Sequence, residues 1–133
     1  PIRHDHYGWP DSPRFAWKPV AGSDLVELPV TTAKLGKRTL AAGGGGFFRL
    51  LPYQFSRWAI RQVNEQAGRP AIIYFHPWEI DPGQPRRTDA PLRSRLRHYT
   101  NLSVMAAKLR RLTRDFAWTR VDALADAQAA LAP

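Results

Sequence analysis

The stretch Ala71-Ile72-Ile73-Tyr74-Phe75-His76 decides the fold. Its first five residues form a continuous apolar run of strand length that does not alternate with polar residues. A run of this kind is typical of a central parallel strand that is buried on both faces. The sequence therefore predicts a buried strand over 71–75, with His76 at its carboxyl end.

A helix is predicted directly before this strand, over about 53–66. Pro52 fits the first turn of a helix, and Gly68 suits the position just after its end. The apolar face is expected to contain four residues at helical spacing: Phe55, Trp58, Ala59 and Val63. Helix, short turn and buried strand form half of an α/β unit, so we expect the α/β class, with two or three strands and about three helices in this chain.

The other elements have weaker signals. Short strands are expected over 25–30, over 39–42 and around Trp118. Pro29 makes the first of these an edge strand or ends it. The segment Gly43–Gly46 is expected to be a turned loop whose backbone passes close to a helix or a ligand. The prolines and glycine within 80–92 predict a loop. Helices are expected over about 103–115, capped by Asn101 or Ser103, and over 121–131.

The 133 residues suit a single region with an irregular opening segment over 1–24, a part with strands, helix and histidine over 25–82, and a basic loop with helices over 83–133. The chain begins with Pro1, and its one methionine is Met105, so we expect it to be part of a longer protein. The absence of cysteine excludes disulfides, thiolate metal sites and a cysteine nucleophile. No membrane span or signal peptide is predicted, and the expected location is cytoplasmic.

The net charge of +9 is concentrated in one part of the chain. Residues 86–114 contain nine basic residues and one acidic residue, Asp89. A basic face of this kind suits nucleic acid, an anionic membrane or an anionic polymer. A solvated surface rich in arginine explains the same pattern equally well.

His76 is the residue that most suggests chemistry. In parallel α/β folds the carboxyl ends of the strands form the floor of the active site. A histidine there can donate a proton or bind a metal, or it can close the strand through a structural hydrogen bond. Trp78 suits either a sugar ring or the core. Glu79 and Asp81 suit acid/base work, although a solvated loop explains them better.

Two other histidine patterns are weaker. His4 and His6 have the residue type of metal ligands, but no third ligand is near in the sequence, so no metal site is expected there. His98 lies among arginines and a tyrosine, which indicates a surface position with a possible role in anion binding.

Three sequence blocks resemble a known family. They are Gly45-Gly46-Phe47-Phe48-Arg49-Leu50-Leu51-Pro52-Tyr53, then Gly68-Arg69-Pro70-Ala71 with Tyr74-Phe75-His76-Pro77-Trp78-Glu79-Ile80-Asp81-Pro82, and then Arg95-Leu96-Arg97-His98-Tyr99-Thr100-Asn101-Leu102. Together they are similar to the C-terminal region of bacterial polysaccharide deacetylases encoded with exosortase (PEP-CTERM) exopolysaccharide systems. The resemblance runs from Pro1 to about Leu124.

This resemblance implies a distorted (β/α) barrel of the NodB type and hydrolysis of N-acetyl groups on an exopolysaccharide. The family uses a divalent metal, usually zinc, held by an aspartate and two histidines, with a second aspartate as general base. Its late Leu-x-His motif, which supplies the general acid, falls on Tyr74-Phe75-His76, so the resemblance makes His76 the general acid. Tyr74 replaces the leucine beside the acetyl pocket. Trp78, Arg49 and Tyr99 are the other expected substrate contacts.

The remaining family motifs have no counterpart in this sequence: there is no Asp-Asp pair, no His-x-x-x-His and no Arg-x-Pro block. The chain is therefore expected to be the back half of the enzyme, to bind no metal itself and to be inactive alone. Its expected partners are an N-acetylated polysaccharide and the missing N-terminal half, rather than nucleic acid. Two alternatives stay open: a non-catalytic module that binds an anionic glycan or nucleic acid through 86–114, and a structural role of 77–133 in bracing the barrel.

Overall fold

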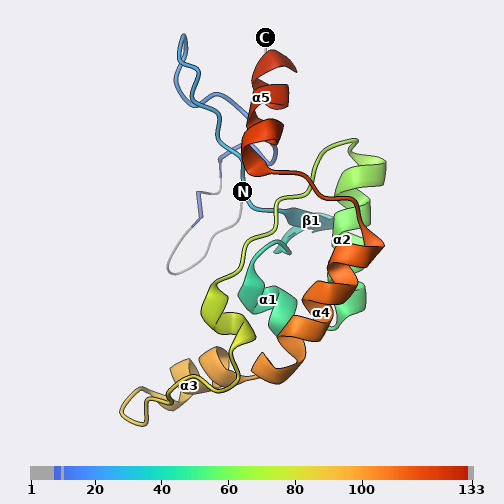
Figure 1. Cartoon of the computed structure of the whole chain (residues 1–133). Coiled ribbons are helices and arrows are strands. Elements are labelled where there is room, and N and C mark those ends of the chain that lie inside the picture. Colours follow the sequence, from blue (N-terminus) through green and yellow to red (C-terminus); the bar gives the residue numbers. More distant parts are fainter. Residues whose placement is uncertain (1–7, 10, 132–133) are drawn as a thin grey trace.

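The computed structural model describes residues 8–9 and 11–131. It is a mixed α/β structure with a two-stranded sheet (Figure 1). In chain order the elements are β1 (Thr32–Leu35), β2 (Arg38–Ala41), α1 (Gly45–Leu50), α2 (Tyr53–Arg61), the π-helical turn η1 (Gln62–Gln66), the 3-10 helix η2 (Pro77–Ile80), α3 (Leu92–Tyr99), α4 (Leu102–Asp115) and α5 (Val121–Leu131). The α/β class is thus confirmed. His4 and His6 lie outside the described residues.

The sheet is one antiparallel hairpin. β1 pairs with β2 from Thr32 opposite Ala41 to Leu35 opposite Arg38. The hairpin turn contains Gly36, whose φ of +57° favours glycine. The strand expected over 39–42 corresponds to β2, but the strand expected over 25–30 is wrong. That segment makes one isolated bridge, between Glu27 and Trp17, and a regular strand begins only beyond Pro29, which lacks an N–H group for a ladder.

The stretch 71–75 is extended, but it is not the doubly buried strand that its composition predicts. Ile72 exchanges hydrogen bonds with Thr31, and the Tyr74 N–H donates to the Gly43 carbonyl over 2.9 Å. These partners belong to two different segments, so no continuous ladder forms. Tyr74 and Phe75 are each 42% exposed. The prediction of a strand buried on both faces is therefore wrong, because neighbouring segments contact the stretch at separate points.

The helix expected over 53–66 is confirmed by α2 and η1 together. Pro52 is its N-cap, and Gly68, with φ of +59°, follows its end. The predicted apolar face is only partly right. The buried residues of this helix are Tyr53, Ser56, Ala59, Ile60 and Val63. Phe55 and Trp58 instead pack on each other at the edge, with ring centroids 5.6 Å apart.

The main core lies between α1, α2 and α4. Its buried members are Phe48, Tyr53, Ile60, Met105 and Leu112. Partly buried residues close it from the extended stretch and from α4: Ala71, Ile73, Leu109 and Phe116. The amphipathic helix expected over 103–115 is thus confirmed. Asn101 is its N-cap residue, but its side chain makes no capping hydrogen bond. This core holds the extended stretch and η2 in place.

The helices α5 and α3 lie at opposite ends of the molecule (Figure 1). At one end, α5 confirms the helix expected over 121–131. Trp118 does not begin a strand, because 117–120 forms no regular structure and the indole N–H donates to the Leu112 carbonyl. At the opposite end, α3 was not predicted, and it buries none of its residues. Residues 81–91 form the expected loop. None of the described helices is long and apolar enough to cross a membrane.

We expect Met105→Ala to lower the free energy of unfolding by about 2–5 kcal/mol, because it removes a fully buried side chain from the centre of the core. Urea denaturation measures the change. The neighbouring Val104→Ala is the matched control, since Val104 is exposed and should change the same free energy by less than about 0.5 kcal/mol. Equal effects of the two variants would contradict this core.

Candidate functional site

A cavity of about 650 Å³ is the candidate site. It lies between α1, the end of the extended stretch, η2 and the segment 85–99 that includes most of α3. The five side chains predicted from the sequence all line it: Arg49, Tyr74, His76, Trp78 and Tyr99. The structure therefore brings together residues that are up to 50 positions apart in the sequence. Their individual roles remain predictions.

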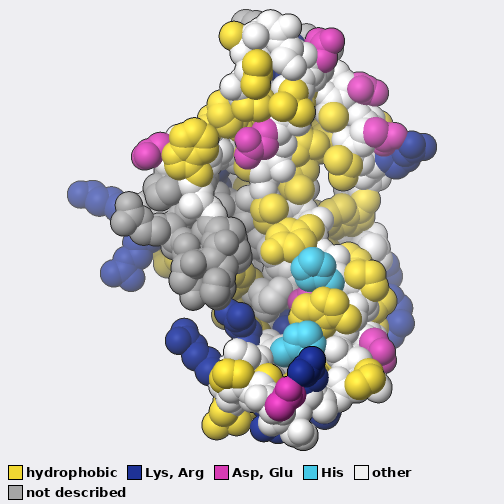
Figure 2. All heavy atoms as spheres, turned by 90° about the vertical axis from the view of Figure 1, so that its left-hand side faces the viewer, with side chains coloured by type: hydrophobic (Ala, Val, Ile, Leu, Met, Phe, Trp, Pro, Cys, Tyr) yellow, Lys and Arg dark blue, Asp and Glu magenta, His cyan; other side chains and the backbone are white. Residues whose placement is uncertain are grey.

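One wall of the cavity is a row of five aromatic rings, which we call the aromatic ladder: Tyr74, His76, Trp78, His98 and Tyr99. The Trp78 ring lies between two nearly parallel imidazoles, 5.8 Å from His76 and 4.0 Å from His98. The tyrosines close the row by edge-on contacts at both ends. Such contacts stabilise aromatic pairs beyond simple burial. Figure 2 shows the described histidines in line with hydrophobic side chains on one face.

His76 is fixed through its backbone and leaves its ring exposed. Its N–H donates to Glu79 Oε2 over 3.0 Å, and its carbonyl accepts the Glu79 N–H over 3.0 Å. Residue 76 follows residue 74 on the same side of an extended chain, so both rings face the cavity. His76 and Glu79 together form the capping box at the start of η2. His76 is thus held at the wall of the cavity, where it is exposed.

Glu79 and Asp81 do not form a carboxylate pair. Glu79 is 2% exposed, and its Oε1 lies 3.6 Å from Nε of Arg49, which is 1% exposed. Asp81 accepts the N–H of Gly83 in the exposed loop. The carboxylates thus have separate structural tasks, one in a buried ion pair and one in a turn.

Arg49 holds the cavity wall together. Its guanidinium donates to the carbonyl oxygens of Arg97, His98 and Thr100, which end α3. Burial lowers the pKa of Arg49, and the charge of Glu79 opposes that shift. A cation at a helix carboxyl end is favourable because it meets the unpaired carbonyls there. Arg49 therefore positions α3 against η2, and its predicted contact with a substrate would be additional to this role.

His98 is a functional candidate that the sequence did not place correctly. Its ring is partly buried between Trp78 and the last residue of α3, and its Nε2 lies 2.9 Å from Gln84 Oε1. Burial and the nearby Arg49 charge lower the pKa of His98, so its neutral form is favoured. The expected surface position is wrong because it depended on the neighbouring charges. The stacking partner lies twenty residues earlier, and no local pattern reveals it.

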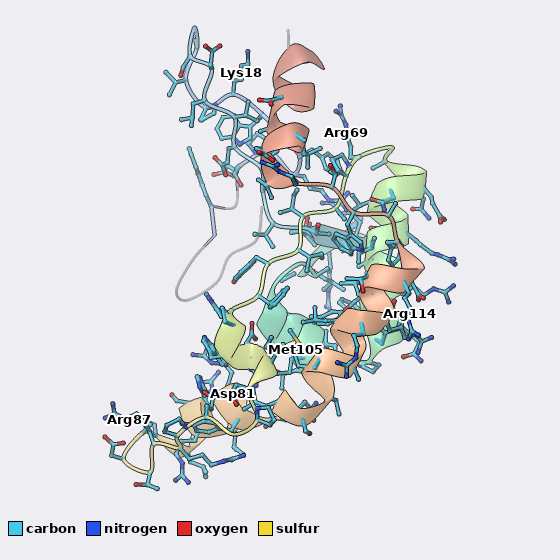
Figure 3. All side chains as sticks on the ribbon, in the orientation of Figure 1. Lys18, Arg69, Asp81, Arg87, Met105 and Arg114 are labelled. Atoms are coloured by element: carbon cyan, nitrogen blue, oxygen red, sulfur yellow. The ribbon has the colours of Figure 1, made fainter. Side chains whose placement is uncertain are left out.

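The basic block 86–114 divides into two unrelated surfaces. Arg87, Arg95 and Arg97 line the cavity. On α4, Lys108 Nζ instead donates to the carbonyls that end α1, over 2.7–3.2 Å, and Arg111 lies over the Tyr53 ring. Figure 3 shows Arg87 at the lower left of the molecule and Arg114 at the right, well apart from each other. The block is thus not one continuous binding face.

The backbone of Gly43–Gly46 lies very close to neighbouring atoms, and the segment includes the start of α1. A Cβ at Gly43 would lie 2.4 Å from the Ile72 carbonyl, and a Cβ at Gly45 would lie 2.1 Å from Glu79 Oε2. The expected close backbone approach is therefore confirmed. The expected loop is only partly right, because Gly45 and Gly46 begin α1. The glycines let α1 start directly against the buried ion pair.

The described residues do not fit a metal site. They contain no group of three or more histidine, aspartate, glutamate or cysteine side chains that could hold an ion. His76 and His98 are separated by the Trp78 ring, and Glu79 is neutralised by Arg49. The donor set needed for the metal implied by the sequence resemblance is thus not provided by this part of the chain.

The family model described as Domain of unknown function (DUF3473) matches residues 1–126. The chain belongs to this family. No curated protein and no solved structure matches the chain.

We expect Gly45→Ala to destabilise the protein by about 1–3 kcal/mol, because the added methyl group would overlap the buried Glu79 carboxylate and Phe75. Gly46→Ala is the matched control: no atom lies within 4 Å of its Cβ, and alanine favours a helix over glycine by about 0.5–1 kcal/mol. Thermal and urea unfolding should therefore move in opposite directions for the two variants. Equal stabilities of the two variants would contradict the close approach of Gly45 to Glu79.

Proposed function

We propose that this chain forms part of a polysaccharide deacetylase and contributes the side of the active site that carries His76. Three lines support the proposal. The family is associated with polysaccharide deacetylases. The three sequence blocks resemble that class, and the side chains that they predict line one cavity. The single observation that carries the most weight is the exposed His76 ring, held in the aromatic ladder at the wall of that cavity.

Amide hydrolysis explains why such a ring is useful. Water adds to the acetyl carbonyl, and the C–N bond of the resulting tetrahedral intermediate then breaks to give acetate and an amine. The amine leaves poorly as an anion, so a general acid must give the nitrogen a proton as the bond breaks. An imidazole is suited to this task near neutral pH. In the proposal, His76 holds and donates this proton, Tyr74 lies beside the acetyl group, and Trp78 fixes the plane of the imidazole.

In this proposal the water-activating metal is held elsewhere in the longer protein. The described residues do not provide its ligands, so we assign none of its chemistry to this chain. In the proposal the ligands belong to the rest of a longer protein, whose segments complete a NodB-type barrel beside the extended stretch. The exposed Tyr74 and Phe75 fit this arrangement, since they leave apolar surface for a neighbouring segment.

The proposal that the metal ligands belong to the rest of a longer protein can be tested directly. We expect the isolated 133-residue chain to release no acetate from chitooligosaccharides in the presence of zinc. Its sequence has no Asp-Asp pair and no His-x-x-x-His, and its described residues contain no group of ligands for the metal that activates water. Acetate is measured enzymatically after incubation, with circular dichroism to show that the chain is folded. Steady turnover by the folded chain would contradict the proposed division.

The role of His76 is tested in the longer protein that contains this chain. We expect His76→Ala to lower kcat for N-acetyl substrates by about 10²–10⁴-fold, with unchanged metal content, since a general acid contributes that much. Hydrolysis of an activated aryl acetate should fall far less, because its leaving group needs no proton. The control is His98→Gln, which removes the other imidazole beside Trp78 but leaves His76. Loss of metal in His76→Ala, or equal losses on both substrates, would contradict the assignment.

A further inference from the structure

The charges at the cavity are unbalanced. Four arginines line it, and Glu79 is the one carboxylate among its described lining residues. Glu79 is paired with Arg49, and Arg87 is paired with Asp89 over 2.6 Å. Arg95 and Arg97 have no carboxylate partner within ion-pair distance among the described residues. Two guanidinium groups therefore border the cavity with their charge uncompensated by the described chain.

The geometry of α3 places these two arginines on either side of a row formed by Ser94 and His98. Ser94 and His98 are four residues apart and also line the cavity, so they lie along the face that α3 turns toward it. At 100° per residue, Arg95 and Arg97 flank this row on opposite sides. A ligand that enters along the row would meet one guanidinium on each side.

Core packing does not explain why α3 is held in this position. The helix has no buried residue, and Leu92 and Leu96 are 67% and 58% exposed. Contacts at its carboxyl end hold it instead: Arg49 donates to the carbonyls there, and the His98 ring stacks on Trp78. A buried cation and one stacked ring thus hold a helix that has no buried residue, and the side chains delivered to the cavity include Arg95, Arg97 and His98.

We propose that the cavity binds an acidic polysaccharide and that Arg95 and Arg97 pair with carboxylates of its sugar units. This inference rests on the proposed function in taking the ligand to be a polysaccharide. Guanidinium groups match carboxylates in shape and charge through paired N–H donors. The aromatic ladder forms the adjoining wall, where ring edges and the Tyr74 hydroxyl face sugar hydroxyl groups.

The ladder also favours a glycan over a single-stranded nucleic acid. Binding of unpaired bases depends on aromatic faces that are free to stack. In this cavity the Trp78 ring already has three neighbours: the near-parallel rings of His76 and His98, and the Arg49 guanidinium 5.5 Å from its centroid. The Tyr99 ring is contacted by Arg86, 5.0 Å from its centroid, and by the edge-on His98. These rings are already engaged, so the cationic groups and ring edges are what remain for a ligand.

The test measures binding of the 133-residue chain by isothermal titration calorimetry at 0.15 M salt. The probes are oligogalacturonate, a neutral chitooligosaccharide of equal length and a single-stranded DNA of similar charge. We expect oligogalacturonate to bind at least about tenfold more tightly than either other probe. Arg95→Gln with Arg97→Gln should weaken that binding at least about tenfold, which corresponds to the loss of roughly 1.4 kcal/mol.

The matched control is Arg93→Gln with Arg110→Gln, which removes the same charge from exposed positions that do not line the cavity. It should weaken binding less than about threefold. Equal losses in the two double variants, tighter binding of the DNA or of the neutral glycan, or no binding by the unaltered chain would overturn the inference. Because oligogalacturonate has no acetyl group, these results are independent of acetate release and of the His76 test.

Discussion

The buried pair of Arg49 and Glu79 is the interaction on which the cavity depends. It joins three segments that are distant in the sequence: α1 carries the arginine, η2 carries the glutamate, and the last carbonyls of α3 receive the guanidinium. The second carboxylate oxygen of Glu79 holds the backbone of His76. Burying two charges is costly unless each has further hydrogen-bond partners, and here most are supplied by backbone groups. Removing either partner would leave an unpaired buried charge, so the pair sets the relative positions of the ladder, α3 and the glycine-rich start of α1.

The elements that the sequence predicted well are those with local signals. The helix from Tyr53 to Gln66 is bounded by Pro52 and Gly68, whose backbone preferences act within one turn. The periodicity of α4 marks a face that packs on the core, and Met105 and Leu112 confirm it. For the site, the residues named from the sequence resemblance meet at one cavity because three blocks distant in the sequence converge on Arg49 and Glu79.

The features that the sequence did not predict depend on contacts between residues that are far apart in the sequence. The run 71–75 has the composition of a central strand, but Thr31 and Gly43 contact it at separate points, and two of its five residues, Tyr74 and Phe75, stay exposed. The buried face of α2 is displaced from the one expected because the core it meets is formed by α4. No local pattern reveals α3, since it is held by Arg49 and by the stacking of His98 on Trp78, and both partners lie far away in the sequence.

The contacts at the carboxyl end of α1 determine when the cavity can form during synthesis. α1 has six residues, too few for a helix to be stable alone in water. Its last carbonyls are capped by Lys108, which is about sixty positions further along the chain. During synthesis, the glycine-rich start and the helix that follows it would therefore remain unformed until most of α4 has left the ribosome. The wall that carries Arg49 is thus completed late, and any segment that joins the chain at this wall would find its docking surface only once synthesis has passed α4.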